Sequence, residues 1–146
     1  MSQLREFTVR VGRKQRQAIN QAMIDAILKE IMTLLARFLE TGEPGVIDLK
    51  LLPRMNAATY QRLKDILATG EVTALVEAEA KVAVRETLYP GVWWLTHHDE
   101  EGAIVTELIE ITKIPELLAS HVGDMRAGLA RFERMLGEAA RNEASP

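Results

Sequence analysis

The chain has 146 residues, of which 47% are hydrophobic and 27% are charged, and its formal net charge is −3. This size and balance predict a single globular domain, residues 1–146, and the acidic charge argues against nucleic acid as a partner. The absence of cysteine excludes disulfides, thiol catalysis and cysteine-ligated zinc or iron–sulfur sites within this chain.

The N-terminal segment, residues 1–17, is locally basic and has no hydrophobic centre. We therefore do not expect a secretory signal peptide. No apolar run in the chain approaches the roughly 20 residues of a membrane span, so we also expect no membrane partner. The segment is interpreted as a solvated leader, with a polyanion-binding arm as the alternative. Residues 7–11 alternate in hydrophobicity and suggest a short strand.

A long helix is predicted over about 14–41, because apolar residues recur at steps of three and four. Gly42 follows at the position of a helix C-cap. The stripe indicates a helix that packs on the core beside a sheet; half of a dimer seam is the alternative, so a homodimer stays open. The stripe consists of Ile19, Met23, Ile27, Ile31, Leu34, Leu35 and Phe38.

Residues 42–53 contain two glycines and two prolines around a short apolar run. They predict a loop whose apolar side chains tuck against the core. Asn56 then offers an N-cap for a second helix over 56–69, and Gly70 is expected to close it. The inner face of this helix is predicted to hold Tyr60, Leu63, Ile66 and Leu67.

The stretch 71–112 is rich in β-branched and aromatic residues and is cut by turn signals. Four strands are predicted, at about 71–78, 82–88, 91–97 and 103–112, with links short enough for antiparallel neighbours. The fold class is therefore α+β. We expect a mainly antiparallel sheet of about four strands, packed against the long N-terminal helix, the second helix and C-terminal helices.

Two C-terminal helices are predicted over about 115–141. Pro115 suits the first turn of a short helix, because its missing N–H would be unpaired there in any case. Asp124 is placed as the N-cap of a final helix that runs to about Arg141. The inner face of that helix is predicted to hold Met125, Leu129, Phe132 and Leu136.

Alternation along the second strand places Glu86 on the same side as Val82 and Val84, an apolar face that a carboxylate avoids unless it is paired or hydrogen-bonded. One interpretation is a strand-end carboxylate that caps the turn at 89–91 or meets an arginine. Another is a buried polar anchor in a binding cleft. Catalysis is the third, without a second carboxylate or histidine at local spacing to support it.

Trp93 and Trp94 follow a rigid turn, since Pro90 presets its first corner and Gly91 tolerates a positive φ at the second. Neighbouring strand residues point to opposite faces, so one indole is expected to pack inward and the other to lie under a helix or on the surface. An exposed indole is a natural interface hot spot. Partner binding by one of the two tryptophans is therefore a hypothesis.

The turn at 97–102 begins with His97, His98 and Asp99, so metal binding has to be considered, with His121 as a further ligand. Adjacent histidines on a strand diverge, and a turn alone does not hold ligands in place. We expect a solvated hairpin turn and no metal site. A metal-handling protein that uses the His97 and His98 region is kept as an alternative function.

Glu107 and Glu110 point to opposite faces of the last strand, which removes a paired-carboxylate site. No hydroxyl residue lies in a nucleophile elbow, and the turn with Gly42 and Gly45 lacks the lysine of a P-loop. We therefore expect no catalytic residue, no cofactor and no enzymatic activity.

Five short segments occur in order: IDLKLLP at 47–53, GEV at 70–72, ET at 86–87, PGVWW at 90–94 and IEITKIP at 109–115. Their order and spacing resemble the C-terminal domain of HupH/HyaF-type hydrogenase expression proteins, over a core of about 42–115. The family-like positions are Asp48, Pro53, Gly70, Glu71, Glu86, Thr87, Gly91, Val92, Trp93, Ile114 and Pro115.

The resemblance implies a cytoplasmic accessory protein for the expression or maturation of nickel–iron hydrogenases. Its partner would be an immature hydrogenase subunit, with the small iron–sulfur subunit favoured, or another maturation protein, held in the manner of a chaperone. Larger family members carry an additional N-terminal portion, so this chain is expected to perform part of their role. A dimeric scaffold without enzymatic activity is the further alternative. The residues predicted to bind the partner are Glu86, Thr87, Pro90, Gly91, Trp93 and Trp94, and a structural role is predicted for Asp48, Pro53, Gly70, Glu71 and Pro115.

Overall fold

The computed structural model describes residues 18–145, so the strand suggested at 7–11 and the basic leader lie outside the described residues. The predicted α+β class is confirmed. The chain divides into two compact units, one ending at Lys113 and the other beginning at Ile114. The elements are α2 (Gln21–Thr41), β1 (Gly45–Asp48), η1 (Leu49–Leu51), α3 (Ala57–Leu67), β2 (Thr73–Glu77), β3 (Lys81–Glu86), β4 (Val92–His98), β5 (Ile104–Ile111), η2 (Glu116–Leu118) and α4 (Val122–Ala144).

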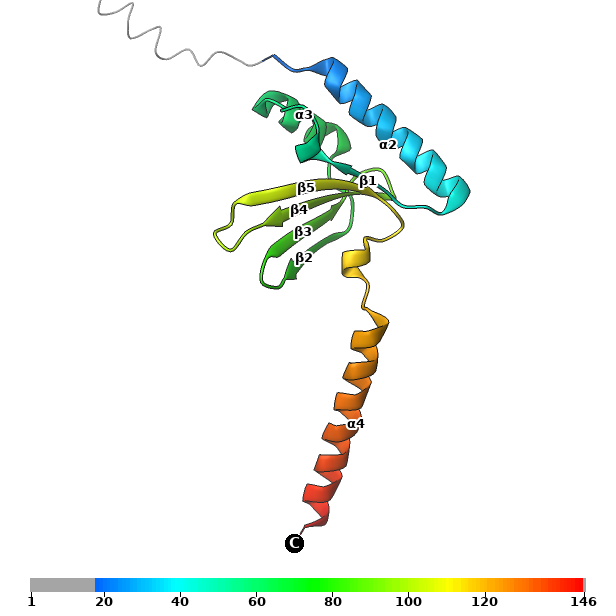
Figure 1. Cartoon of the computed structure of the whole chain (residues 1–146), viewed down its shortest axis with the longest axis vertical. Coiled ribbons are helices and arrows are strands. Elements are labelled where there is room, and N and C mark those ends of the chain that lie inside the picture. Colours follow the sequence, from blue (N-terminus) through cyan, green and yellow to red (C-terminus); the bar gives the residue numbers. More distant parts are fainter. Residues whose placement is uncertain (1–17, 146) are drawn as a thin grey trace, which may run out of the picture. The chain divides into compact units, whose positions relative to one another are not determined.

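The sheet of the first unit has five antiparallel strands in the order β1-β5-β4-β3-β2, one more than predicted (Figure 1). The additional strand is β1, which the sequence analysis placed in a loop. It pairs with β5 from Gly45 opposite Ile111 to Asp48 opposite Leu108. A strand of four residues is too short to show an alternating pattern. This edge strand can therefore be identified only from its pairing with β5.

Helix α2 begins later than predicted. Asn20 is its N-cap, and the Asn20 side chain accepts a hydrogen bond from the N–H of Met23 at 3.1 Å. Ile19 therefore lies before the helix and is 47% exposed. At the other end Gly42 is the predicted C-cap, with a φ of 75° and an N–H that donates to the carbonyl of Phe38. These caps satisfy backbone groups that a helix end would otherwise leave unpaired.

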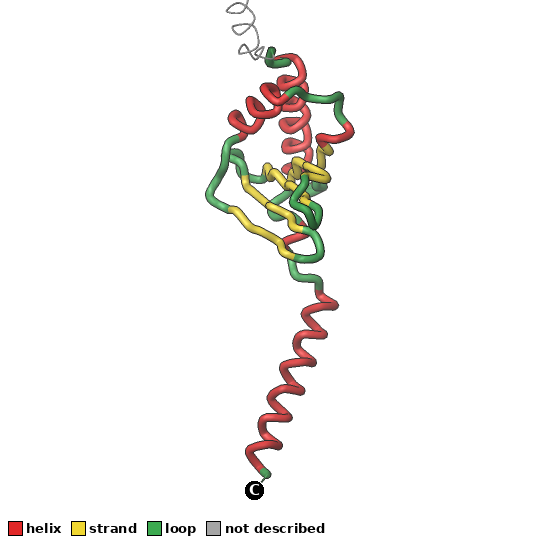
Figure 2. The backbone as a smooth tube through the Cα atoms, turned by 90° about the vertical axis from the view of Figure 1, so that its left-hand side faces the viewer, coloured by secondary structure: helices red, strands yellow, loops and turns green. Residues whose placement is uncertain are grey.

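The predicted stripe of α2 faces the sheet of its own chain. Ile27 and Ile31 lie in the core, and Leu35 and Phe38 pack against it. Figures 1 and 2 place α2 and α3 on the same side of the sheet. This stripe is therefore not available as a dimer seam. The buried core consists of Ile27, Ile31, Ile47, Leu49, Leu63, Leu67, Val92, Trp94, Ile109 and Ile111.

Helix α3 has the predicted N-cap, since the Asn56 side chain accepts from the N–H of Thr59 at 2.8 Å. Its end differs from the prediction, because the C-cap is Ala68 with a φ of 52°, and Gly70 does not close the helix. Gly70 instead lies against the turn after β3. A Cβ at this position would sit 2.4 Å from the carbonyl oxygen of Thr87, so only glycine fits.

The second unit contains η2 and α4. The short helix predicted after Pro115 is the 3₁₀ turn η2. Helix α4 begins at Val122 with His121 as its N-cap, so Asp124 lies in the first turn and not at the cap. The four side chains predicted to form an inner face are 59–64% exposed, which contradicts their assignment to a core. Periodicity identifies the residues that share a face, but it does not identify what covers that face. None of the described helices is long and apolar enough to cross a membrane.

Substitution of Gly70 by alanine tests the close approach to Thr87. We expect it to lower the free energy of unfolding by about 2 kcal/mol, because the new methyl group forces a backbone shift. Chemical denaturation measures the change. Gly137→Ala is the matched control, since a Cβ there meets nothing within 4 Å and alanine is the better helix former. Equal effects of the two substitutions would contradict the packing argument.

Candidate partner-binding site

The turn between β3 and β4 is held by hydrogen bonds on several sides. Within it, the N–H of Tyr89 donates to the Thr87 hydroxyl at 3.2 Å, and the N–H of Val92 donates to the carbonyl of Tyr89 at 3.0 Å. From outside, the carbonyl of Leu67 accepts from the N–H of Leu88 at 2.9 Å. Gly91 has a φ of 85°, as the predicted turn requires. The backbone of this turn is therefore preorganised.

Three consecutive apolar residues at the tip of this turn face solvent. Leu88 is 63% exposed, Tyr89 is 51% exposed, and Pro90 is exposed as well. We call Leu88, Tyr89 and Pro90 the corner loop. An apolar surface on a fixed backbone loses little conformational entropy when it meets a partner, which makes this loop the candidate contact surface.

Neither indole reaches the surface. Trp93 is 5% exposed and its Nε1 donates to the carbonyl of Thr112 at 3.1 Å. Trp94 is 2% exposed and its Nε1 donates to a carboxylate oxygen of Glu107 at 2.6 Å. Of the two predicted alternatives for the second indole, a surface position is therefore wrong, because residues on both faces of β4 are buried from Val92 to Leu95. The two indoles therefore do not form the outer surface of the site.

Glu86 and Thr87 mark the end of β3 and the start of the turn. Glu86 is half-buried and lies opposite Trp93 in the strand register. Its backbone carbonyl accepts from the N–H of Gly70 at 2.7 Å. Thr87 is 2% exposed, so its side chain supports the turn from inside. These positions hold the corner loop in place.

The residues predicted to be structural occupy distinct positions. Asp48 is the N-cap of η1 and accepts from the N–H of Lys50 at 3.0 Å. Pro53 lines an apolar pocket beside α2. Glu71 is exposed and Pro115 is fully buried.

A buried carboxylate, which the sequence pattern only excluded from a paired-carboxylate site, ties α3 to the sheet. Glu107, on β5, is 8% exposed and accepts from the Tyr60 hydroxyl at 2.7 and 2.8 Å. It also accepts from Trp94 Nε1 and from the Thr96 hydroxyl, the latter at 3.2 Å. We call these four residues the Glu107 cluster. Its three donors come from one helix and the neighbouring strand, so they offset the cost of burying the charge.

The aromatic rings of the cluster are packed against each other and a lysine. Tyr60 and Trp94 meet edge to face, with ring centroids 5.9 Å apart. Lys64 Nζ lies 5.2 Å from the Tyr60 centroid and 5.5 Å from the Trp94 centroid, within the range of a cation–π interaction. Burial, and then the hydrogen bond and charge of Glu107, raise the pKa of the Tyr60 hydroxyl well above its ordinary value. Tyr60 therefore stays a donor.

A surface pocket of about 300 Å³ opens onto Glu107. Because three donors already occupy the carboxylate, it is a poor general base, and the cluster is built for support. The rim carries Lys50 and Arg54, both exposed. The other lining residues are Leu49, Leu52, Met55, Tyr60 and Ile104.

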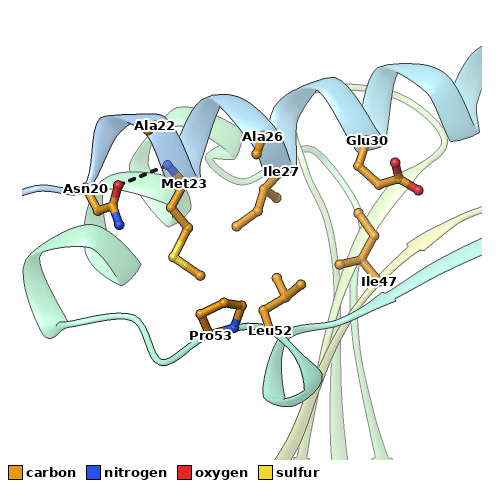
Figure 3. A pocket seen from close by; sticks show the side chains of 9 residues that line it. All are labelled: Asn20, Ala22, Met23, Ala26, Ile27, Glu30, Ile47, Leu52 and Pro53. Atoms are coloured by element: carbon orange, nitrogen blue, oxygen red, sulfur yellow. Dashed lines mark hydrogen bonds between the residues drawn. The ribbon is translucent and has the colours of Figure 1, made fainter.

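A second pocket, of about 460 Å³, lies between α2 and the segment after η1, and we call it the α2 pocket (Figure 3). Figure 3 shows Met23, Leu52 and Pro53 directed toward the same space, with Ile27 of α2 and Ile47 of β1 farther along it. Its lining is almost entirely apolar, so it suits an apolar side chain and not a charged ligand.

The histidine-containing turn, residues 97–102, is held by hydrogen bonds between side chains and backbone. The Asp99 side chain accepts from the N–H groups of Glu101 and Ala103, which closes the turn with Gly102 at a φ of 85°. His98 Nδ1 lies 3.2 Å from the carbonyl of Gly102. Across residues 18–145, no three histidine, aspartate or glutamate side chains are grouped closely enough to hold a metal ion.

A signal for Glu107 was present in the sequence. Alternation places it on the same face of β5 as Ile109 and Ile111, the pattern that drew attention to Glu86 on β3. Its partner Tyr60 lay on the predicted inner face of α3. What the sequence does not contain is the register that brings Glu107 opposite Thr96 and next to Trp94.

Comparisons with known proteins agree with the fold. Residues 22–139 match the family model described as HupH hydrogenase expression protein, C-terminal conserved region. The chain is 30% identical over 93 residues to the hydrogenase expression/formation protein HupQ of Azotobacter chroococcum mcd 1, covering 64% of this chain and 32% of that protein. It is 28% identical over 95 residues to the hydrogenase expression/formation protein HupH of Rhodobacter capsulatus, covering 65% and 34%. The chain thus spans about a third of the length of these curated relatives.

A solved structure is similar over most of the chain. The hydrogenase expression protein HupH from Thiobacillus denitrificans ATCC 25259 matches with a TM-score of 0.75 and 34% sequence identity. The match covers 79% of this chain and 95% of that one. The fold described above is therefore shared with a solved protein of that name.

Replacement of Glu107 by leucine should cost about 3–5 kcal/mol in the free energy of unfolding, because it leaves buried donors without an acceptor. Adding Tyr60→Phe removes one of those donors, so the double variant should recover part of the loss. Denaturation curves measure both. Glu100→Leu, at an exposed position, is the control and should change stability by less than about 0.5 kcal/mol. A Glu107→Leu effect no larger than this control would contradict the support role.

The raised pKa of Tyr60 predicts a pH dependence. Above about pH 10 the unfolded chain loses the Tyr60 proton while the folded chain keeps it, so stability falls as pH rises. Tyr60→Phe has no such proton, and the stability difference between wild type and this variant should narrow from pH 9 to pH 11. Denaturation curves at matched ionic strength test this. A constant difference would show that the folded state does not hold the proton more tightly.

Proposed function

The chain belongs to the family of the HupH hydrogenase expression protein C-terminal conserved region, and from this premise we propose that it is an accessory protein in hydrogenase expression. In this proposal it acts in the cytoplasm and binds an immature nickel–iron hydrogenase subunit, the small subunit first, in the manner of a chaperone. It performs no catalysis of its own.

The observation that carries this proposal is the family match over residues 22–139, which extends across all the strands and helices from α2 to most of α4. Several curated relatives are named hydrogenase expression/formation proteins. The site adds physical support: its buried polar groups hold structure, and the three side chains of the corner loop are exposed and apolar, as at the centre of many interfaces.

The proposed contact surface is the corner loop. Its three exposed apolar side chains stand on a backbone fixed by Thr87, Gly91 and the carbonyl of Leu67. Tyr89 provides a large, rigid ring with a polar tip, the side-chain type that dominates interface energetics. The predicted residues Glu86, Trp93 and Trp94 act in this proposal from beneath, by holding that loop.

Co-purification tests the function. The full chain, expressed from its own locus with a small tag in cells that make a nickel–iron hydrogenase, is expected to retain a hydrogenase subunit or a maturation protein. Deletion of the gene is expected to lower hydrogenase activity. Absence of any such partner, together with unchanged hydrogenase activity in the deletion strain, would overturn the proposal.

Matched variants test the surface. Leu88→Ser with Tyr89→Ser should reduce retention of the partner about tenfold or more while leaving the fold intact, because both side chains are exposed. Ala26→Arg is the comparison, since it fills the α2 pocket with a charged side chain. If Ala26→Arg abolishes retention and the corner variant does not, the partner binds at the α2 pocket and the assignment to the corner loop is wrong.

A further inference from the structure

Helix α4 carries an exposed apolar stripe with a regular spacing. Val122, Met125, Leu129, Phe132 and Leu136 are each at least 59% exposed. They follow one another at steps of three, four, three and four residues, and the series continues to Ala139 in a helix of 23 residues. This alternation is the a/d pattern of a two-helix seam, in which each apolar residue packs between residues of a facing helix.

The composition of α4 indicates that the helix needs another surface packed on this stripe to be stable. The helix contains Gly123, Gly128 and Gly137, and glycine is among the weakest helix formers. Helices of this kind draw their stability from the packing of an amphipathic face.

We propose that α4 pairs with α4 of a second copy of this chain in an antiparallel two-helix seam. In such a pair each a position meets a d position of the other helix. One register brings Leu129 next to Phe132 of the second copy and Met125 next to Leu136 of the second copy, with Val122 meeting the small Ala139 at each end. All six stripe positions are then used.

Charge complementarity supports the second copy as occupant. With Val122, Leu129 and Leu136 at the a positions, the d positions are Met125, Phe132 and Ala139. Arg126 directly follows Met125, and Glu133 directly follows Phe132. In the antiparallel register, Arg126 of each helix lies beside Glu133 of the other, which gives two symmetric ion pairs around the central layers. A parallel pair would instead bring Arg126 beside His121 and leave Glu133 next to Gly128. The charges therefore favour the antiparallel arrangement.

A hollow in α4 fits the same register. Gly128 leaves a depression of about 210 Å³ that is also lined by Arg131, Phe132 and Met135. Met135 is 54% exposed and, in the antiparallel pair, lies over Gly128 of the second copy. A flexible thioether is suited to filling such an irregular gap. The glycine that weakens the isolated helix thus becomes a receiving site.

Sedimentation of the full chain at micromolar concentrations tests the pairing. The wild type is expected to be a dimer, and Phe132→Glu should raise its dissociation constant about a hundredfold or more by burying a charge in the seam. Ala127→Glu places the same charge on the opposite side of α4 and should change the constant less than about threefold. A monomeric wild type, or a dimer insensitive to Phe132→Glu, would overturn the proposal.

A charge exchange tests the partner and the register without altering the apolar stripe. Arg126→Glu and Glu133→Arg should each weaken the dimer about three- to tenfold, and the double variant should restore it, because only the exchanged pair recovers opposite charges across the seam. This outcome is specific to a second copy of α4 and survives if Phe132→Glu unfolds the helix. Failure of the double variant to recover would rule out this register.

The absence of cysteine allows a single spin label to be attached at Asn142→Cys. In the antiparallel register the two labelled positions are separated by about 35 Å along the helix axis, whereas a parallel pair would hold them about 10 Å apart. Distance measurement by pulsed electron resonance distinguishes the two. A short distance would overturn the antiparallel arrangement.

Discussion

The carboxylate of Glu107 is the interaction on which the first unit depends. It lies at the point where α3 crosses β4 and β5, and it accepts hydrogen bonds from both layers. A buried charge without these donors would cost far more than the apolar contacts around it could offset. Helix α3 and the sheet must therefore pack in one relative position. In it the Tyr60 hydroxyl lies within hydrogen-bond distance of both oxygens of Glu107, and the Trp94 indole donates to Oε2.

The contacts that fix the packing of α3 on the sheet lie next to those that fix the backbone of the corner loop. Trp94 joins the Glu107 cluster, while its neighbour Trp93 is anchored to the carbonyl of Thr112. These contacts hold the β4 side of the turn, while on the β3 side Gly70 allows the segment after α3 to pass within contact of Thr87. The family-like residues Gly70, Thr87 and Gly91 thus act through geometry: they hold three apolar side chains outward on a backbone that needs no rearrangement to bind.

Local sequence patterns are sufficient to predict most helices and strands, but not which of them pack or pair with one another. The α2 stripe, the Asn56 cap and the alternation of β3 each follow from short-range rules, and the structure confirms them. Strand β1 and the Glu107 cluster could not be assigned in the same way, because both depend on contacts between residues more than 40 positions apart in the chain. The choice between a covered and an exposed second indole is left open by the sequence for a related reason, since alternation separates two faces without showing which of them is covered.

The two units differ in how they use apolar surface. In the first, helices cover a core that a single carboxylate keeps in register, and the apolar stripe of α2 is used in that core. In the second, α4 has the spacing, flanking charges and glycine hollow of a seam, but it has no buried residue of its own. The corner loop and the α4 stripe share no residue and belong to different units, so a dimer formed through α4 would carry two corner loops. Two corner loops on one dimer would then act together, and a partner with two sites, or a pair of partners, would be held more tightly than by either loop alone.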